Sequence, residues 1–377
     1  MKAALLLSLL SSATSAGLNE AFTAWSVAHA KQYSTPAARA VGQAAFAESL
    51  AAIEEASRMN PHAAFELNAD ADMPAREFRR RATGYVGGSV LSSARSPVTV
   101  AVPPKSLGAI DWRAKGAVDA TIYKQGDCGC CWAISVAQTV GSQWYLHGHN
   151  ASTVPSLSFQ ELICCDCGGV DAGCHGGDPH SAYEAIIARG GLESAAAYPF
   201  TDSGPDAQSC NLEGKCAKCA FDATKVAASI VGYRNVTSAD RASGAGGNET
   251  ELALALLAKG PLSICIDSDP WRFYSSGILS YGARSLNHCV QLVGFDATHS
   301  PPYWIAKKYV RYRAPATAAR FVRRAQLTSA PPLPANFPPS SHGSSWGAAW
   351  GESGYIRMQM GSDVCGVADV ATLPLIG

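Results

Sequence analysis

Residues 125–135 place several cysteines where a loop meets the start of a helix. They read Gln-Gly-Asp-Cys-Gly-Cys-Cys-Trp-Ala-Ile-Ser, and the chain up to Tyr145 has no proline and carries apolar residues at helical spacing. The first backbone N–H groups of a helix lack partners within it and the helix dipole is positive there, so a cysteine at this point is favoured as a thiolate. Because the thiolate is the nucleophilic form, the stretch predicts a nucleophilic cysteine.

This stretch resembles the segment around the nucleophile of papain-like cysteine peptidases, Cys-Gly-Ser/Ala-Cys followed by Trp or Tyr. The resemblance implies that Cys131 is the nucleophile, Cys128 a disulfide cysteine and Gln125 a donor to the oxyanion hole. Loss of one such donor typically slows acyl transfer by about 10²–10³-fold. The sequence departs from the family at Cys130. A simpler interpretation, that these are disulfide cysteines of a secreted protein, holds for Cys128 and stays open for Cys131.

His288 lies 157 residues after Cys131, in the sequence Leu-Asn-His-Cys-Val, and resembles the catalytic base of the same family. The resemblance implies a thiolate–imidazolium pair that attacks the substrate carbonyl and then protonates the leaving amine. It also assigns the substrate-binding positions, which are Gly177 for the substrate backbone, Cys265 and Cys289 for the walls of the P2 pocket, Val370 for its floor, and Trp346 as the shield of the base. Because Val370 is uncharged, we predict an apolar P2 residue. Whether Cys265 and Cys289 are bonded to each other stays open.

The family pattern is interrupted after the base. An Asn directly before Ser-Trp-Gly orients the imidazole in the family, whereas here Lys308 and Ser344 flank the gap and Ser345-Trp-Gly follows it. The 36 intervening residues, 309–344, contain five Arg, six Pro and no acidic residue, and show no periodicity. A structureless run of this length between two strands is unusual in a compact domain.

We therefore interpret residues 309–344 as largely a translated intron. If Lys308 is encoded by AAG and followed by a Tyr codon, the two codons contain a GT splice donor. If Ser344 is encoded by AGY, its codon contains an AG splice acceptor. Joining the two sites gives an Asn codon directly before Ser345. The alternative is a genuine basic insertion. The Cys–His pair would then lack its orienting Asn, and the chain would be a catalytically impaired paralogue that acts as a binding module.

The first residues and the bulk composition indicate a secreted protein. Residues 1–16 read as a secretory signal, too short to span a bilayer, and no later stretch is apolar enough to span one. The thirteen cysteines fit the oxidising compartment that such a signal implies. The net charge is zero, so nucleic acid is not expected as a partner.

Residues 17–101 have aromatic and aliphatic residues at helical spacing in two runs, followed by Asn-x-Asp-x-Asp-Met and a Gly/Ser-rich linker. They resemble the inhibitory propeptide of the family, and the alternative is an unrelated helical hairpin. Residues 102–377 resemble the peptidase domain. The resemblance implies an α+β, papain-like two-domain fold, with a helical L domain and a β-rich R domain facing each other across the substrate cleft.

The remaining cysteines and three possible glycosylation sites are expected on the outside of this domain. The resemblance implies the disulfides Cys128–Cys174 and Cys165–Cys210. Four extra cysteines could bind zinc or form disulfides, and the secretory route favours disulfides; they are Cys164, Cys167, Cys216 and Cys219. Asn150, Asn235 and Asn248 begin glycosylation motifs, and the last two are expected in an exposed loop.

The sequence thus predicts a monomeric cysteine endopeptidase, secreted or endolysosomal, which is made as a zymogen and cleaves protein or peptide substrates without a cofactor or metal. Its own propeptide is the expected inhibitor. Two alternatives remain: the impaired paralogue described above, which would not hydrolyse peptides, and a zinc-stabilised cysteine-rich protein, which would lose its fold with a chelator.

The transcript across the codons for Lys308 and Ser344 tests the intron interpretation. We expect a message that joins AA to a pyrimidine and reads Asn-Ser-Trp-Gly. Sequencing of the complementary DNA is the measurement. A message that retains all 36 codons makes the insertion genuine and favours the impaired paralogue.

Overall fold

The computed structural model describes residues 15–82, 84–87, 104–123, 125–126, 128–149, 152–166, 168, 170–201, 216, 219–238, 247–308 and 350–377. Several predicted features lie outside these ranges, namely most of the predicted signal, the segment 309–344, Trp346, Cys167, Cys210 and Asn150. No helix in the described part of the chain is long and apolar enough to cross a membrane.

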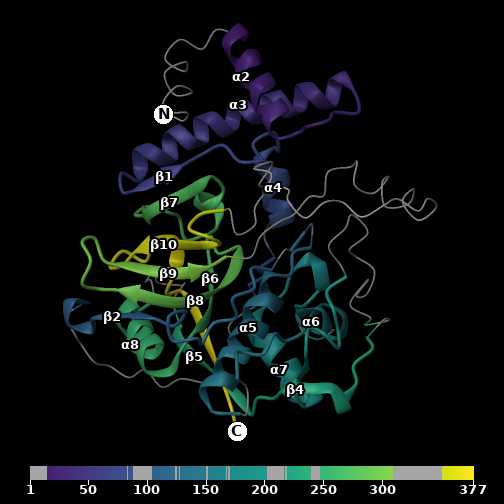
Figure 1. Cartoon of the computed structure of the whole chain (residues 1–377), viewed down its shortest axis with the longest axis vertical. Coiled ribbons are helices and arrows are strands. Elements are labelled where there is room, and N and C mark those ends of the chain that lie inside the picture. Colours follow the sequence, from purple (N-terminus) through teal and green to yellow (C-terminus); the bar gives the residue numbers. More distant parts are fainter. Residues whose placement is uncertain are drawn as a thin grey trace, which may run out of the picture.

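Two crossing helices, α2 (Ser15–Ala28) and α3 (Pro36–Met59), form one end of the molecule (Figure 1). Thr35 caps α3 by accepting a hydrogen bond from the N–H of Ala38, and Pro36 occupies the first turn, where no N–H is needed. The rings of Phe22 and Phe46 pack at a centroid distance of 5.5 Å, and both side chains are buried. The aromatic spacing in the sequence thus corresponds to a helix pair with its own apolar contact.

From this pair the chain descends through β1 (Ala63–Phe65) and α4 (Ala75–Ala82) towards the rest of the molecule. β1 adds an antiparallel edge strand to β7 (Tyr274–Leu279). Beside it, the buried Arg272 donates hydrogen bonds to the carbonyl oxygens of Asp70 (2.8 Å) and Met73 (2.5 Å). The N-terminal segment is therefore held by backbone pairing and by one buried guanidinium.

The helical half consists of α5 (Cys131–Leu146), α6 (Phe159–Cys165) and α7 (Pro179–Arg189). The short strands β3 (Leu192–Glu193) and β4 (Val226–Ala228) pair beside them. Residues 131–143 of α5 are all buried, since this helix packs on α6 and α7 on one side and on the sheet on the other. A helix buried on every side is typical of the centre of a large core.

The β-rich half is a sheet in the order β1-β7-β10-β9-β8-β6-β11-β5, with β2 (Ala109–Asp111) paired to β8. Its pairs are antiparallel except for β7 with β10. The remaining elements are β5 (Gly232–Ser238), α8 (Glu249–Lys259), β6 (Leu262–Ile266), β8 (His288–Asp296), β9 (Tyr303–Lys307), β10 (Tyr355–Gln359) and β11 (Val370–Leu375). Figure 1 shows this sheet on one side of α5 and the helices α6 and α7 on the other. The chain is thus α+β, as predicted.

The sheet continues directly across the interrupted region. β9 and β10 pair with Lys307 opposite Tyr355, and the N–H of Lys308 donates a 2.9 Å hydrogen bond to the carbonyl of Gly354. The two sides of the interruption are therefore neighbours in the sheet.

Two predictions about the outside of the domain are wrong, namely the disulfide Cys165–Cys210 and the exposed loop around Asn235. Cys128 is bonded to Cys174 as predicted, but Cys165 is bonded to Cys219 and not to Cys210. The sequence alone could not show whether Cys210 or Cys219 is the partner of Cys165. Cys219 lies shortly before β4, and the pairing of β4 with β3 brings this part of the chain back beside the helices. Cys164 and Cys216 are also disulfide-bonded, so the thiolates that the zinc alternative required are not available.

Asn235 does not lie in an exposed loop. It is part of β5, its Oδ1 lies 2.6 Å from Nε2 of His180, and the hydroxyl of the buried Thr237 donates to the carbonyl of Ala368. Asn248 caps α8 by accepting hydrogen bonds from the N–H groups of Thr250 and Glu251. Residues of both glycosylation motifs therefore make hydrogen bonds within the folded chain.

Replacing Arg272 by Met should weaken the attachment of the N-terminal segment, because two buried carbonyls lose their donor. We expect the free energy of unfolding to fall by about 1–3 kcal/mol, measured by urea denaturation, with faster hydrogen exchange in β1. Arg58→Met, which removes only an exposed ion pair with Glu55, is the control and should change neither quantity. Equal behaviour of the two variants would contradict the anchoring role.

Candidate active site

Cys131 is the first residue of α5 and its side chain is completely buried. Burial raises the pKa of the Cys131 thiol to about 12, while nearby backbone N–H groups, among them those of Cys289 and Gly84, act in the opposite direction. Cys289 belongs to β8 and Gly84 to the N-terminal segment. The sulfur therefore lies where the helix, the sheet and the N-terminal segment meet.

His288 is the first residue of β8, the strand on which α5 packs. The imidazole is buried, and burial together with the positive charge of Lys308 lowers the pKa of His288 to about 3. In this covered state both the thiol and the imidazole are neutral. The fold thus brings the two predicted catalytic residues to one place, from elements far apart in the sequence.

Gln125 lies on the loop before α5 and is 3% exposed. Its Nε2 has no hydrogen-bond partner within the described part of the chain. An unsatisfied buried donor typically costs about 1–3 kcal/mol, and such groups are usually explained by a functional requirement. The Gln125 amide is therefore a donor held ready for an acceptor that the folded chain does not itself provide.

Residues 84–87 lie across this site as an extended segment. The N–H groups of Gly84 and Tyr85 both donate to the carbonyl of Asn287 at 3.1 Å. On the opposite side, Val86 N–H donates to the carbonyl of Gly177 (3.1 Å), and Gly177 N–H donates to the carbonyl of Gly84 (2.9 Å). The chain itself thus occupies the backbone hydrogen-bonding positions next to the thiol.

Glycine at position 177 is required for this close approach. A Cβ there would collide with the Asp171 carboxylate and would lie 2.6 Å from the Trp132 ring. Gly84 is equally constrained, because its Cβ would collide with the carbonyl of Gly129. The two backbone segments can therefore approach this closely only because both positions are glycine.

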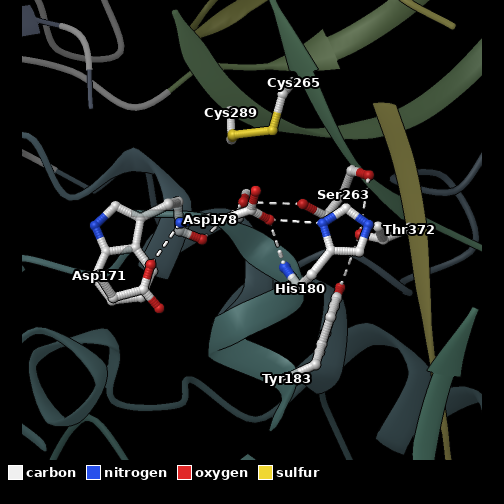
Figure 2. Close-up of a disulfide and its surroundings, with 10 residues drawn as sticks. Asp171, Asp178, His180, Tyr183, Ser263, Cys265, Cys289 and Thr372 are labelled. Atoms are coloured by element: carbon white, nitrogen blue, oxygen red, sulfur yellow. Dashed lines mark hydrogen bonds and ion pairs between the residues drawn. A yellow bond between two sulfur atoms is a disulfide. The ribbon is translucent and has the colours of Figure 1, made fainter. Parts of the chain in front are cut away.

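The predicted pocket residues lie on three neighbouring strands. Cys265 of β6 is directly opposite Cys289 of β8 and also opposite Val370 of β11. Cys265 and Cys289 form a disulfide, which resolves the question that the sequence left open. Figure 2 shows this bond next to polar residues from α7 and the sheet. The disulfide fixes the spacing of β6 and β8 at the point where His288 begins its strand.

A cluster of acidic residues and one histidine supports the Gly177 loop, and sequence reasoning missed it (Figure 2). Asp171 Oδ1 accepts a 2.6 Å hydrogen bond from the N–H of Asp178, and Asp178 Oδ1 lies 2.6 Å from Nδ1 of His180. Burial and the neighbouring Asp166 carboxyl raise the pKa of Asp171 to about 9, so this group is protonated at neutral pH. Three aspartates within thirteen residues around Gly177 were the available signal.

Lys308 stands beside the base, where the sequence analysis expected an Asn. Its Nζ lies 4.4 Å from the ring centroid of Trp350 and 5.5 Å from that of Trp271. Burial lowers the pKa of Lys308 to about 7, and the negative charge of Asp70 opposes this shift. The structure thus places a buried amine next to His288.

Comparison with known proteins supports a single family. The family model described as papain family cysteine protease matches residues 107–309 and 342–375, so residues 310–341 are unmatched. Cysteine proteinase A of Leishmania mexicana is 30% identical over 312 residues, covering 81% of this chain and 71% of that protein. Digestive cysteine proteinase 2 of Homarus americanus is 29% identical over 320 residues, covering 82% of this chain and 79% of that protein.

Among solved structures, digestive procathepsin L 3 from the larval midgut of Tenebrio molitor is similar, with a TM-score of 0.66 and 27% identity. The match covers 95% of this chain and 99% of that one, so it includes the N-terminal helices as well as the two halves around the cleft.

The buried Asp171 predicts a pH dependence of stability. Its raised pKa means that the folded chain keeps a proton which the unfolded chain releases near pH 4, so the free energy of unfolding should fall between about pH 4 and pH 9. One such proton contributes at most about 1.4 kcal/mol per pH unit. Asp171→Asn keeps an acceptor for Asp178 N–H but has no proton to lose, and should flatten this decline in urea denaturation at pH 5, 7 and 9.

The control is Asp296→Asn. This exposed aspartate has a lowered pKa because the Thr298 hydroxyl donates to it, so it does not titrate in this range and the slope should be unchanged. If the free energy of unfolding of Asp171→Asn changes with pH as it does in the original chain, the proton is not held on Asp171.

Proposed function

The chain belongs to the papain family of cysteine proteases, and we propose that it is an endopeptidase that cleaves peptide bonds through a thioester on Cys131. The observation that carries the proposal is the packing of α5, which begins with Cys131, on β8, which begins with His288, because it sets the nucleophile and the base on adjoining elements. We place the enzyme in the secretory route, lysosomal or extracellular.

In this proposal His288 takes the proton of the Cys131 thiol, and the sulfur attacks the substrate carbonyl. Negative charge builds on the carbonyl oxygen and is stabilised by the N–H of Cys131 and the unpaired Nε2 of Gln125. The imidazolium then protonates the leaving amine. Water, activated by the neutral imidazole, hydrolyses the thioester and returns the thiol.

The protein is zymogen-like, and we propose that residues 17–101 are the inhibitory segment and residues 102–377 the enzyme. Residues 84–87 hold the backbone positions of Gly177 and of Asn287, the residue directly before His288. Burial under this segment also keeps the thiol and the imidazole neutral. Removing the segment would therefore free the cleft and reduce the desolvation that opposes the ion pair.

For the substrate we propose an apolar residue at P2. The pocket is walled by the Cys265–Cys289 disulfide and closed by Val370, and none of these side chains carries a charge. Peptides that differ only at P2 should be cleaved faster with Leu or Phe than with Arg or Glu. Val370→Glu, which adds a carboxylate to the floor, should increase the relative rate for Arg; an unaltered preference would remove Val370 from the pocket.

The nucleophile is tested by labelling the processed chain with a thiol-reactive epoxide. Cys131→Ala should abolish both labelling and peptide hydrolysis. Cys130→Ser is the matched control, because it removes the adjacent buried thiol and introduces the residue usual in the family, and it should retain both. Labelling that survives in Cys131→Ala would contradict the assignment.

A second candidate function, a catalytically impaired paralogue, is favoured by one observation, the Lys308 amine beside His288. We propose that the chain without residues 309–344 and with Asn at position 308 is the active form. Comparing hydrolysis by that form with hydrolysis by the chain as printed separates the two candidates: activity in both supports a tolerant peptidase, and activity in neither supports the binding module.

A further inference from the structure

Lys308 is held rigidly beside the base. Its backbone N–H is bonded to the carbonyl of Gly354, which extends the pairing of β9 with β10 by one residue. Its side chain is buried, with the ammonium within 4.4 Å of the Trp350 ring centroid and 5.5 Å of that of Trp271. A cation beside an aromatic ring is stabilised more strongly when it is desolvated, so the Trp350 ring, itself stacked on Trp271, retains the amine in this place.

The charged groups that face this amine come from two other elements. β8 and β9 are antiparallel with Gln291 opposite Lys307, so Lys308 lies beside the start of β8, where His288 stands. The positive charge of Lys308 acts against protonation of that imidazole. Asp70 faces it from the N-terminal segment and favours the charged ammonium. Asp70 is itself buried, between β1 and α4, and leaves the site when that segment is removed.

We propose that Lys308 is a positioning residue whose charge decides whether the Cys131–His288 pair can ionise, and that this residue, not the inserted segment, limits the chemistry of the chain as printed. The inference rests on the proposed function, since it concerns the same pair. Two positive charges, the Lys308 ammonium and the His288 imidazolium, cannot both be accommodated in one buried site without a large repulsion.

A pH dependence of defined sign follows. The imidazolium forms readily only when Lys308 is neutral, so the reactivity of Cys131 must rise with pH as Lys308 loses its proton. Burial lowers the pKa of Lys308, which brings this loss below the usual range of a lysine. In the zymogen Asp70 favours the ammonium and therefore acts against ionisation of the pair.

The test measures the rate of Cys131 alkylation by iodoacetamide between pH 5 and pH 9, in the full chain after removal of the N-terminal segment by limited proteolysis. Lys308→Met replaces the amine with an apolar side chain of similar length that can pack against the Trp350 ring. It should move the rise in rate to lower pH, with a gain of about tenfold or more at pH 5.5, which corresponds to a shift of at least one unit.

Lys308→Arg is the matched control, because guanidinium keeps its charge across the whole range. It should remove the rise and leave alkylation slow up to pH 9. Deleting residues 309–344 while keeping Lys308 should leave the profile of the printed chain unchanged.

Identical profiles for the printed chain, Lys308→Met and Lys308→Arg would overturn the proposal, and so would a profile that moves on deletion of the segment alone. If Lys308→Met does not fold, the difference between the pH profiles of the printed chain and Lys308→Arg still tests the proposal. If no variant is alkylated faster than a simple thiol at any pH, the Cys131–His288 pair itself is wrong, and the proposed function fails with the inference.

Discussion

The structure depends on one contact, the packing of α5, which begins with Cys131, on β8, which begins with His288. It joins the start of a helix buried on all sides to the start of a strand in the middle of the sheet. Each element is fixed independently, α5 by its buried residues and β8 by its pairing with β6 and by the Cys265–Cys289 disulfide. The reacting atoms are therefore placed by rigid elements, and the loops around them contribute backbone contacts.

The same burial that builds the site also silences it in the form with its N-terminal segment in place. A thiol and an imidazole both lose hydration when they are covered, and each shifts toward its neutral form because the charged forms are the ones that water stabilises. We propose that residues 84–87 inhibit in two ways, since they occupy the backbone positions at Gly177 and Asn287 and they cover the pair. Inhibition by occupancy and inhibition by desolvation are released together when the segment leaves.

A local signal allowed the sequence to predict the helix start at Cys131, because it depends on a few neighbouring residues. The roles of His288 and Gly177 came from resemblance to the family. The grouping of Cys265, Cys289 and Val370 came from resemblance, and the strand register brings them together. The partner of Cys165, the burial of the motif at Asn235 and the proton on Asp171 were not predictable, since each is set by contacts between segments distant in the chain.

The interrupted region illustrates the difference between what folding tolerates and what chemistry tolerates. The closure entropy of a loop grows only slowly with its length, so a long segment between β9 and β10 adds little to the free energy of folding. The ladder between these strands still forms, up to the bond from Lys308 N–H to Gly354. A single charge beside His288, by contrast, acts directly on the proton that the reaction must move. The fold can therefore be intact while the charge of one buried residue, Lys308, decides in our proposal whether the site works.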